Sequence, residues 1–237
     1  MYQVSTLQAL LLGYTKGVVS VGEFIKHGSI GLGTFANVNG EMIAVDGKVF
    51  KANNKGEATE VSPEEKIPFA AITDMIDSKK FAINDVQSID DLKSILNNSI
   101  EEDFGLNSMH VIRIDGLFPI VKARSEEGLK TRHVKLSEIL RVNQKDFRFE
   151  NIKGTMVCLY FPDYMDGINA PGWHLHFISE DRTKGGHVFD LTIDTAVGTK
   201  SINHNIEIQL PTDAEFDTYS LKTVSDEEVK KVEQGKE

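Results

Sequence analysis

The chain has almost no cysteine, no long apolar run and no excess of basic residues. Cys158 is the only cysteine among 237 residues, which excludes an intramolecular disulfide and removes any need for an oxidising compartment. Lysine and arginine number 26 against 36 aspartates and glutamates, a formal net charge of −10. A chain this acidic lacks the positive field that attracts nucleic acid or anionic lipid, so neither is an expected partner. An anionic substrate would need a few placed cations to hold it.

The apolar stretch 9–12 is not expected to be a targeting or membrane segment. No basic residue precedes it, Gly13 interrupts it, and a membrane span needs ~18 apolar residues. A cytoplasmic location is therefore the expectation. Cys158 lies in the apolar run 157–160, which predicts a buried, inert thiol.

Turn signals divide the chain into short segments with strand character. Asn39-Gly40 and Asp46-Gly47 separate several of them, which predicts an antiparallel meander. The strand candidates are 30–35, 42–45, 49–51, 58–61, 110–114, 118–123, 154–161, 173–179, 187–193 and 201–210. Short helices are expected at 5–12, 19–25, 88–98 and 136–140, and from Ser225 onward; capping boxes mark the starts at Ser88 and Ser225.

Length and pattern together predict an α/β fold of the α+β type. At about 150 residues per domain, the chain allows one large domain or two small lobes. We expect two sheet-based lobes of mostly antiparallel or mixed strands with a few short helices. Residues 1–150 would form the N-terminal lobe, and residues 151–237 a C-terminal β lobe with a histidine-bearing hairpin and a C-terminal helix.

Three histidines lie in a pattern that suits a metal ion. His174 and His176 are two apart, so in a strand their side chains share a face. His187 begins the next strand candidate, and one antiparallel hairpin can thus supply three imidazoles, as in open catalytic zinc sites. Strand parity tests this prediction, because the rings converge only when His187 lies opposite an even-numbered residue such as His176 or Ile178.

Three charged residues are weaker candidates when taken alone. Arg124 ends a strand candidate, where an arginine can bind a carboxylate bidentately, although a solvated surface cation is the simpler interpretation. Glu41 follows a turn, where a solvated carboxylate is expected. Glu233 lies one helical turn after Val229 and would be carried inward if that helix face packs, although a helix so near the chain end can fray.

Several motifs together resemble those of the α-acetolactate decarboxylase family, over nearly the whole chain. They are Gly31-Leu32-Gly33-Thr34-Phe35, Asn39-Gly40-Glu41, Asp46-Gly47-Lys48-Val49-Phe50, Ala123-Arg124-Ser125, Gly172-Trp173-His174-Leu175-His176-Phe177 and Gly185-Gly186-His187-Val188. Asn39 departs from the aspartate usual in the Asp-Gly-Glu turn of the family. The resemblance implies decarboxylation of 2-acetolactate (2-hydroxy-2-methyl-3-oxobutanoate) to acetoin and CO2, a metal between two sheet-based lobes, and a homodimer.

The resemblance also implies roles for individual residues. The zinc ligands would be His174, His176 and His187. Glu41 would lie at or beside the metal, Arg124 and Glu233 would line the reaction centre, and Thr34 would contact the substrate. In this chemistry Zn²⁺ acts as a Lewis acid that stabilises an enediolate, which is then protonated on one face. Glu233 is the favoured proton donor, with Glu41 as the alternative, and Arg124 holds the substrate.

Two other functions fit part of the pattern. His174, His176, Glu180 and Gly186 approximate the motif of a cupin-like metal-dependent oxygenase or isomerase, in which Glu180 would be a ligand and iron or manganese the metal. A closed structural zinc site in a binding protein is also open, with Glu41 as the fourth ligand.

Overall fold

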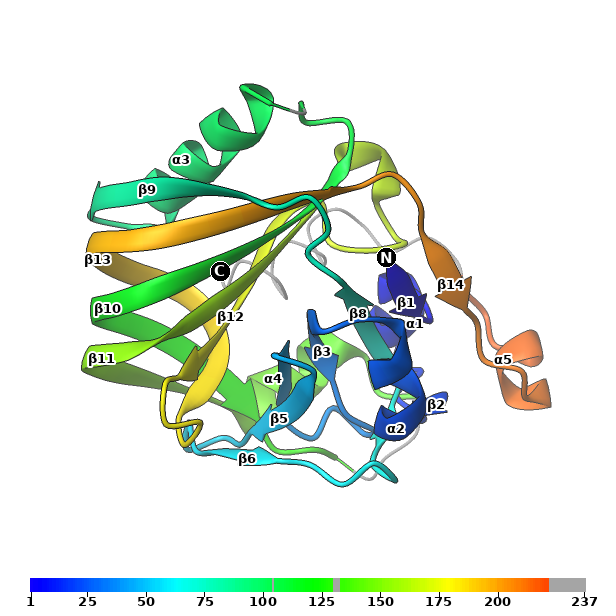
Figure 1. Cartoon of the computed structure of the whole chain (residues 1–237). Coiled ribbons are helices and arrows are strands. Elements are labelled where there is room, and N and C mark those ends of the chain that lie inside the picture. The colour runs from blue at the N-terminus through cyan, green and yellow to red at the C-terminus, as the bar shows by residue number, and fades with distance from the viewer. Residues whose placement is uncertain (104, 130–132, 222–237) are drawn as a thin grey trace.

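The structure, a computed structural model, describes residues 1–103, 105–129 and 133–221, and two large β-sheets dominate its architecture (Figure 1). The first sheet has the strand order β14-β1-β8-β3-β4-β5-β6. Its strands are β1 (Tyr2–Val4), β3 (Ile30–Thr34), β4 (Glu41–Val45), β5 (Lys48–Ala52), β6 (Ala58–Glu60), β8 (Phe69–Thr73) and β14 (Glu207–Gln209). The predicted meander is confirmed, because β3, β4, β5 and β6 are consecutive antiparallel neighbours.

The second sheet is built around three very long strands, β10, β11 and β13, and has the order β10-β11-β12-β13-β9. Its strands are β9 (Lys79–Val86), β10 (Met109–Glu126), β11 (Gln144–Phe161), β12 (Gly172–Ser179) and β13 (Gly185–Asn203). β10 also pairs with β13, so β10 to β13 close on themselves. A two-stranded sheet of β2 (Val19–Ser20) and β7 (Lys66–Ile67) completes the strands described.

The helices are short, apart from one that covers the second sheet. They are α1 (Leu7–Leu11), α2 (Val21–Phe24), α3 (Ile89–Glu101), α4 (Leu136–Asn143) and α5 (Ala214–Thr218), with 3-10 turns at Ile25–His27 and Asp163–Met165. The predicted cap of α3 is confirmed, since Ser88 Oγ accepts a hydrogen bond from the Asp91 N–H at 3.2 Å. Leu92, Leu96 and Ile100 follow one helical stripe and pack against the second sheet.

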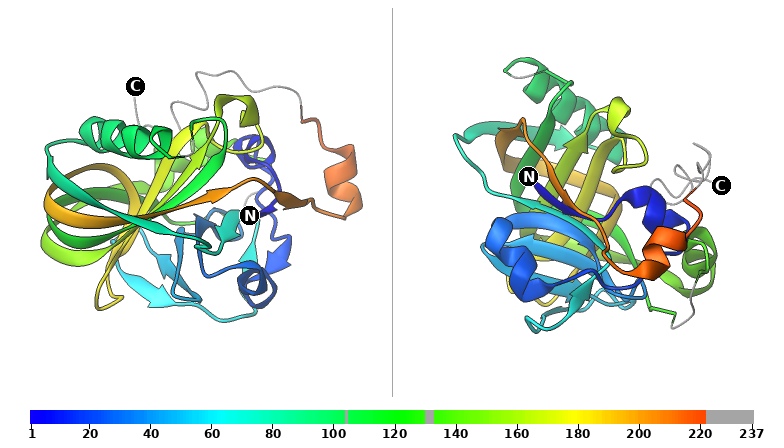
Figure 2. Two further views of the ribbon diagram at one scale, coloured as in Figure 1. Left: turned by 45° about the horizontal axis from the view of Figure 1, so that its top comes forward. Right: turned by 90° about the vertical axis from the view of Figure 1, so that its right-hand side faces the viewer.

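A shared apolar core holds the two sheets together, and Figure 2 shows the sheets packed against each other in two further views. Leu32 and Ile43 of the first sheet lie in one buried cluster with Val157, Leu159 and Ile178 of the second. The α+β architecture of two mostly antiparallel sheets is therefore confirmed, with β1–β14 a parallel pair. The boundary predicted between residues 150 and 151 falls inside β11 and does not divide the sheets. As a boundary between folding units it stays a prediction.

Two predicted strand limits are wrong, each for a physical reason. The segments 110–114 and 118–123 are one strand, β10, because its pairing with both neighbours skips Pro119 and so needs no N–H there. The predicted strand 201–210 is broken: β13 ends at Asn203, and β14 joins the first sheet beside β1.

The first helix is capped by Thr6, not Ser5. The helix predicted from Ser225 lies outside the described residues.

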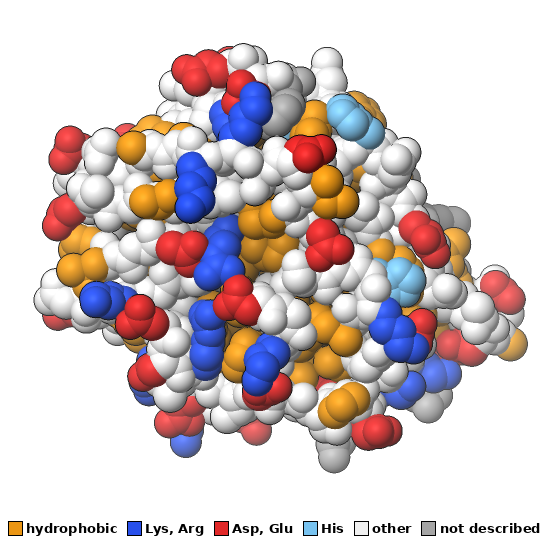
Figure 3. Space-filling model, in the orientation of Figure 1, with side chains coloured by type: hydrophobic (Ala, Val, Ile, Leu, Met, Phe, Trp, Pro, Cys, Tyr) orange, Lys and Arg blue, Asp and Glu red, His pale blue; other side chains and the backbone are white. Residues whose placement is uncertain are grey.

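The face of the molecule shown in Figure 3 carries charges of both signs. Acidic and basic side chains are interspersed on the face shown in Figure 3, without a broad basic area. Within the described ranges, no helix combines the length and the apolar character needed to cross a bilayer.

Candidate metal centre

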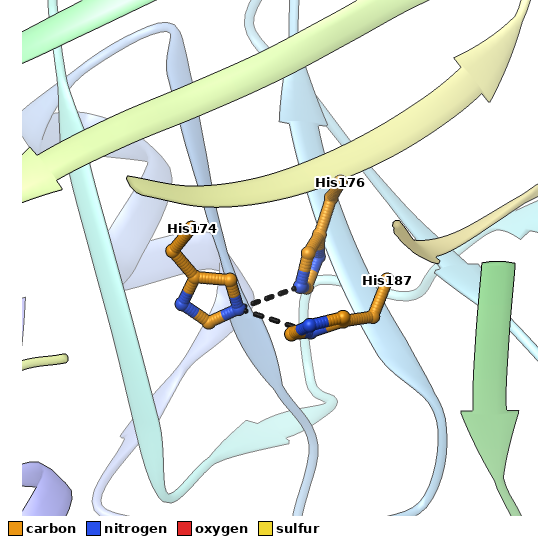
Figure 4. Close-up of side chains that lie close together, drawn as sticks. All are labelled: His174, His176 and His187. Atoms are coloured by element: carbon orange, nitrogen blue, oxygen red, sulfur yellow. Dashed lines mark hydrogen bonds between the residues drawn. The ribbon is translucent and has the colours of Figure 1, made fainter. Parts of the chain in front are cut away.

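The three histidines converge because of the register between β12 and β13. His176 lies directly opposite His187 in the antiparallel pair, so the parity prediction is confirmed. His174 Nε2 lies 3.1 Å from both His176 Nε2 and His187 Nδ1 (Figure 4). These residues form a buried group that could hold a metal ion, with one ring nitrogen of each within 4.8 Å of the others.

Burial keeps the imidazoles of His174 and His176 neutral. It lowers the pKa of His174 to about 3 and the pKa of His176 well below its usual value. His176 Nδ1 lies 2.7 Å from the carbonyl oxygen of Met42 on β4 and donates to it, which leaves the lone pair of Nε2 facing the other two rings. A neutral imidazole with a fixed tautomer is the form that binds a metal.

The spacing of these nitrogens fits a small tetrahedral ion. Zn–N bonds of 2.0–2.1 Å at tetrahedral angles place two nitrogens about 3.3 Å apart. The two separations from His174 Nε2, to His176 Nε2 and to His187 Nδ1, are both 3.1 Å and lie close to this value. Three imidazole nitrogen donors match the ligand set of catalytic zinc sites, which keep a further position open.

Glu41, the first residue of β4, brings a carboxylate from the first sheet to the histidines of the second. Its Oε2 lies 3.3 Å from His176 Nε2 and its Oε1 lies 4.0 Å from His187 Nδ1. The preceding turn depends on Gly40, whose φ of +91° is readily adopted only by glycine. The carboxylate is 12% exposed, so the expectation of a solvated group is wrong. The first sheet supplies the group because the two sheets pack face to face.

Arg124 lies on the other side of His187. It pairs with His187 across β10 and β13, and its Nη2 lies 3.3 Å from His187 Nε2. The residue is 5% exposed, so the solvated surface cation that its sequence position suggests is also wrong. A buried guanidinium beside a candidate metal site can bind an anionic group of a substrate.

The histidines 174 and 187, Glu41 and Arg124 line one cavity together with a set of apolar residues. Its polar side includes Thr34, Glu41, Arg124, His174 and His187. The apolar wall comprises Leu10, Val38, Phe69, Leu136 and Leu140. The Thr34 hydroxyl donates to the Gly40 carbonyl at 3.0 Å and so also supports the turn before Glu41. Glu233 lies outside the described residues, and its place in the site stays a prediction.

Two functional candidates on β10 were not identified from the sequence. Glu126 is 2% exposed and lines the same cavity. Burial raises its pKa to about 7, although the neighbouring Glu41 carboxyl and Arg124 oppose this rise. The sequence signal that could have identified Glu126 is its spacing from Arg124. The two residues are two positions apart in one strand, so their side chains share a face.

Ser125 is the second missed residue, and it connects the two sheets. Its hydroxyl donates to the Ala52 carbonyl at 2.8 Å and accepts from the Glu41 N–H at 3.2 Å. We expect Ser125→Ala to leave both buried groups unpaired and to lower the free energy of unfolding by about 1–3 kcal/mol. Urea denaturation would measure this. Ser94→Ala, which removes a hydroxyl from the exposed face of α3, is the control. A loss no larger than that of the control would contradict the bridging role.

Glu180, the ligand required by the cupin-like interpretation, is not part of the histidine group. It is exposed in the loop after β12, its N–H donates to the Lys153 carbonyl at 2.9 Å, and it lines a different cavity with Arg182. This position does not favour the cupin-like function.

Fold and site together define a β-rich protein with an open three-histidine centre between two sheets, and comparisons with known proteins agree. The family model for alpha-acetolactate decarboxylase matches residues 1–223. The chain is 36% identical to the alpha-acetolactate decarboxylase of Methanosarcina mazei over 233 residues, 98% of this chain and 80% of that protein. It is 35% identical to the alpha-acetolactate decarboxylase of Bacillus subtilis over 215 residues, 91% of this chain and 83% of that protein.

Solved structures show the same relationship. The crystal structure of alpha-acetolactate decarboxylase from Bacillus subtilis superposes with a TM-score of 0.92 at 33% identity and covers 98% of both chains. A Staphylococcus aureus protein described as similar to alpha-acetolactate decarboxylase superposes with a TM-score of 0.88 at 28% identity, over 98% of this chain and 96% of that one. The chain belongs to the alpha-acetolactate decarboxylase family and is a carboxy-lyase.

Proposed function

We propose that this protein converts 2-acetolactate to acetoin and CO2 with Zn²⁺ held by His174, His176 and His187. The observation that carries the proposal is the convergence of three buried imidazoles, one carboxylate and one buried arginine at a single cavity. Family membership supports the substrate class.

The bound ion would supply Lewis-acid chemistry, polarising the substrate ketone and stabilising the negative charge left when CO2 departs. The residues of the chain do the remaining work. Arg124 binds the substrate carboxylate and orients the bond to be broken, because a guanidinium can hold a carboxylate through two parallel hydrogen bonds. The apolar wall receives the methyl groups and keeps water from the reacting carbon.

Glu41 and Glu233 are the proposed acid and base groups. Glu41 is fixed beside His176 and lies at or next to the metal ligands. Glu233 is proposed to deliver a proton to one face of the product carbon, which would make the acetoin chiral. A homodimer and a cytoplasmic location stay predictions.

Acetoin formation from racemic 2-acetolactate tests the proposal, measured with purified protein against the spontaneous rate. We expect strong acceleration that a chelator abolishes and added zinc restores, because the ion is needed to stabilise the developing charge. Chelator already saturated with zinc is the control and should leave the rate unchanged. A zinc-replete sample that does not accelerate the reaction would disprove the proposed function.

The same chelation distinguishes an open catalytic site from a closed structural one. A structural zinc contributes directly to folding, so its removal unfolds the protein. We expect circular dichroism of the apo protein to show a retained fold, because the shared apolar core of the two sheets does not include the three histidines. Loss of the fold on chelation would instead favour the structural site.

A further inference from the structure

Glu126, at the end of β10, places a buried carboxyl group at the cavity. The mechanism above gives this carboxyl group no role. It is 2% exposed and lies at the cavity together with Glu41 and Arg124. A carboxyl group is rarely buried unless a partner compensates for its lost hydration. Its partners therefore indicate what the group does there.

The protein itself satisfies only part of this carboxyl group. Its neighbours are the Glu41 carboxyl, which lies in hydrogen-bond range, and the backbone N–H groups of Gly40 and of Glu126 itself. Its Oε1 is buried and has no hydrogen-bond partner within the described part of the chain. Buried polar atoms in native proteins are nearly always paired, so an unpaired acceptor at a cavity indicates a donor that arrives with a ligand.

The chemistry of the proposed substrate identifies that donor. In 2-acetolactate the carboxylate and the ketone only accept hydrogen bonds, and the two methyl groups are apolar. The 2-hydroxyl group is the single donor in the molecule. Of the groups in this substrate, only the 2-hydroxyl can therefore donate a hydrogen bond to Glu126 Oε1.

We propose that Glu126 is a further substrate-binding residue, whose Oε1 accepts a hydrogen bond from the 2-hydroxyl group of the substrate. This inference rests on the proposed function and refines it: the cavity selects 2-hydroxy-3-oxo acids over 3-oxo acids that lack the hydroxyl. Without the hydroxyl, Glu126 Oε1 stays buried and unpaired when the substrate closes the cavity, which costs binding free energy.

The experiment compares 2-acetolactate with 2-methyl-3-oxobutanoate, the same molecule without the hydroxyl, in wild type and Glu126 variants. We expect Glu126→Leu to lower kcat/KM for 2-acetolactate about 10- to 100-fold, the range for losing a hydrogen bond to a charged or strongly polar group. For 2-methyl-3-oxobutanoate we expect a change of less than about threefold, because no hydrogen bond to the hydroxyl is lost. Glu126→Gln keeps an acceptor oxygen and should stay within a few-fold of wild type with both substrates.

Glu127→Leu is the matched control, because it makes the same substitution one residue later at an exposed position. It should leave both rates unchanged. Circular dichroism verifies that each variant is folded, and metal analysis verifies that it contains zinc. If Glu126→Leu does not fold, Glu126→Ala provides the same comparison.

The outcomes separate this inference from the proposed function. A wild-type protein inactive on 2-acetolactate disproves the function itself. If the wild type is active and Glu126→Leu loses equal activity on both substrates, the hydroxyl contact is disproved. It is also disproved if Glu126→Leu loses no activity on either substrate.

Discussion

His187→Ala is expected to lose both its metal and its activity. The substitution removes one of three nitrogens that lie within 4.8 Å of one another, and two imidazoles alone make a poor zinc site. We expect zinc to fall from about one equivalent to near zero after dialysis, and acetoin formation to fall at least about 10³-fold toward the spontaneous rate. Metal analysis and the acetoin assay on the same sample measure both effects.

Glu180→Ala is the control for this experiment and also tests the cupin-like alternative. Glu180 lies in the loop that joins β12 to β13, outside the histidine group, so its removal should leave zinc content and rate unchanged. Loss of metal from Glu180→Ala, with metal retained in His187→Ala, would reverse the ligand assignment.

Arg124→Ala is expected to separate substrate binding from metal binding. Because its guanidinium is buried and contacts a histidine ring without belonging to the histidine group, the variant should keep its zinc. We expect kcat/KM to fall about 10²- to 10³-fold, as is usual when one partner of a buried charged hydrogen bond is removed. Steady-state kinetics with metal analysis checks this.

Arg124→Lys refines this prediction. It keeps the charge but not the planar pair of donors, so it should recover only part of the lost activity. Arg182→Ala, which removes a surface arginine bonded to Asp46 at 2.7 Å, is the control and should remain fully active. Loss of zinc in Arg124→Ala would contradict a role limited to the substrate.

The histidine centre was predictable from the sequence because strand geometry makes side-chain direction periodic. Residues 174 and 176 must share a face, and the position of residue 187 in the next strand could be tested by parity alone. The turns at Asn39-Gly40 and Asp46-Gly47 were predictable for a similar reason, since glycine supplies backbone angles that other residues avoid. In each case the information is local.

The burial of Arg124, Glu41 and Glu126 was not predictable in this way. Each is a charged residue at a strand end or turn, where exposure is the usual outcome. Their burial results from the packing of the first sheet against the second, which no short stretch of sequence encodes. The continuous strand through Pro119 was missed for the same reason, because only its neighbours in the sheet show that no donor is needed there.

The hydrogen bond from His176 to Met42 has a consequence for how the protein assembles. The two residues are 134 positions apart, so this contact forms only after a large loop of chain has closed. The hairpin alone can present three rings, but a fixed tautomer and the Glu41 carboxylate arrive only when the sheets dock. Full metal affinity should therefore appear late in refolding, and the ion, once bound, should shift the equilibrium away from separated sheets by mass action.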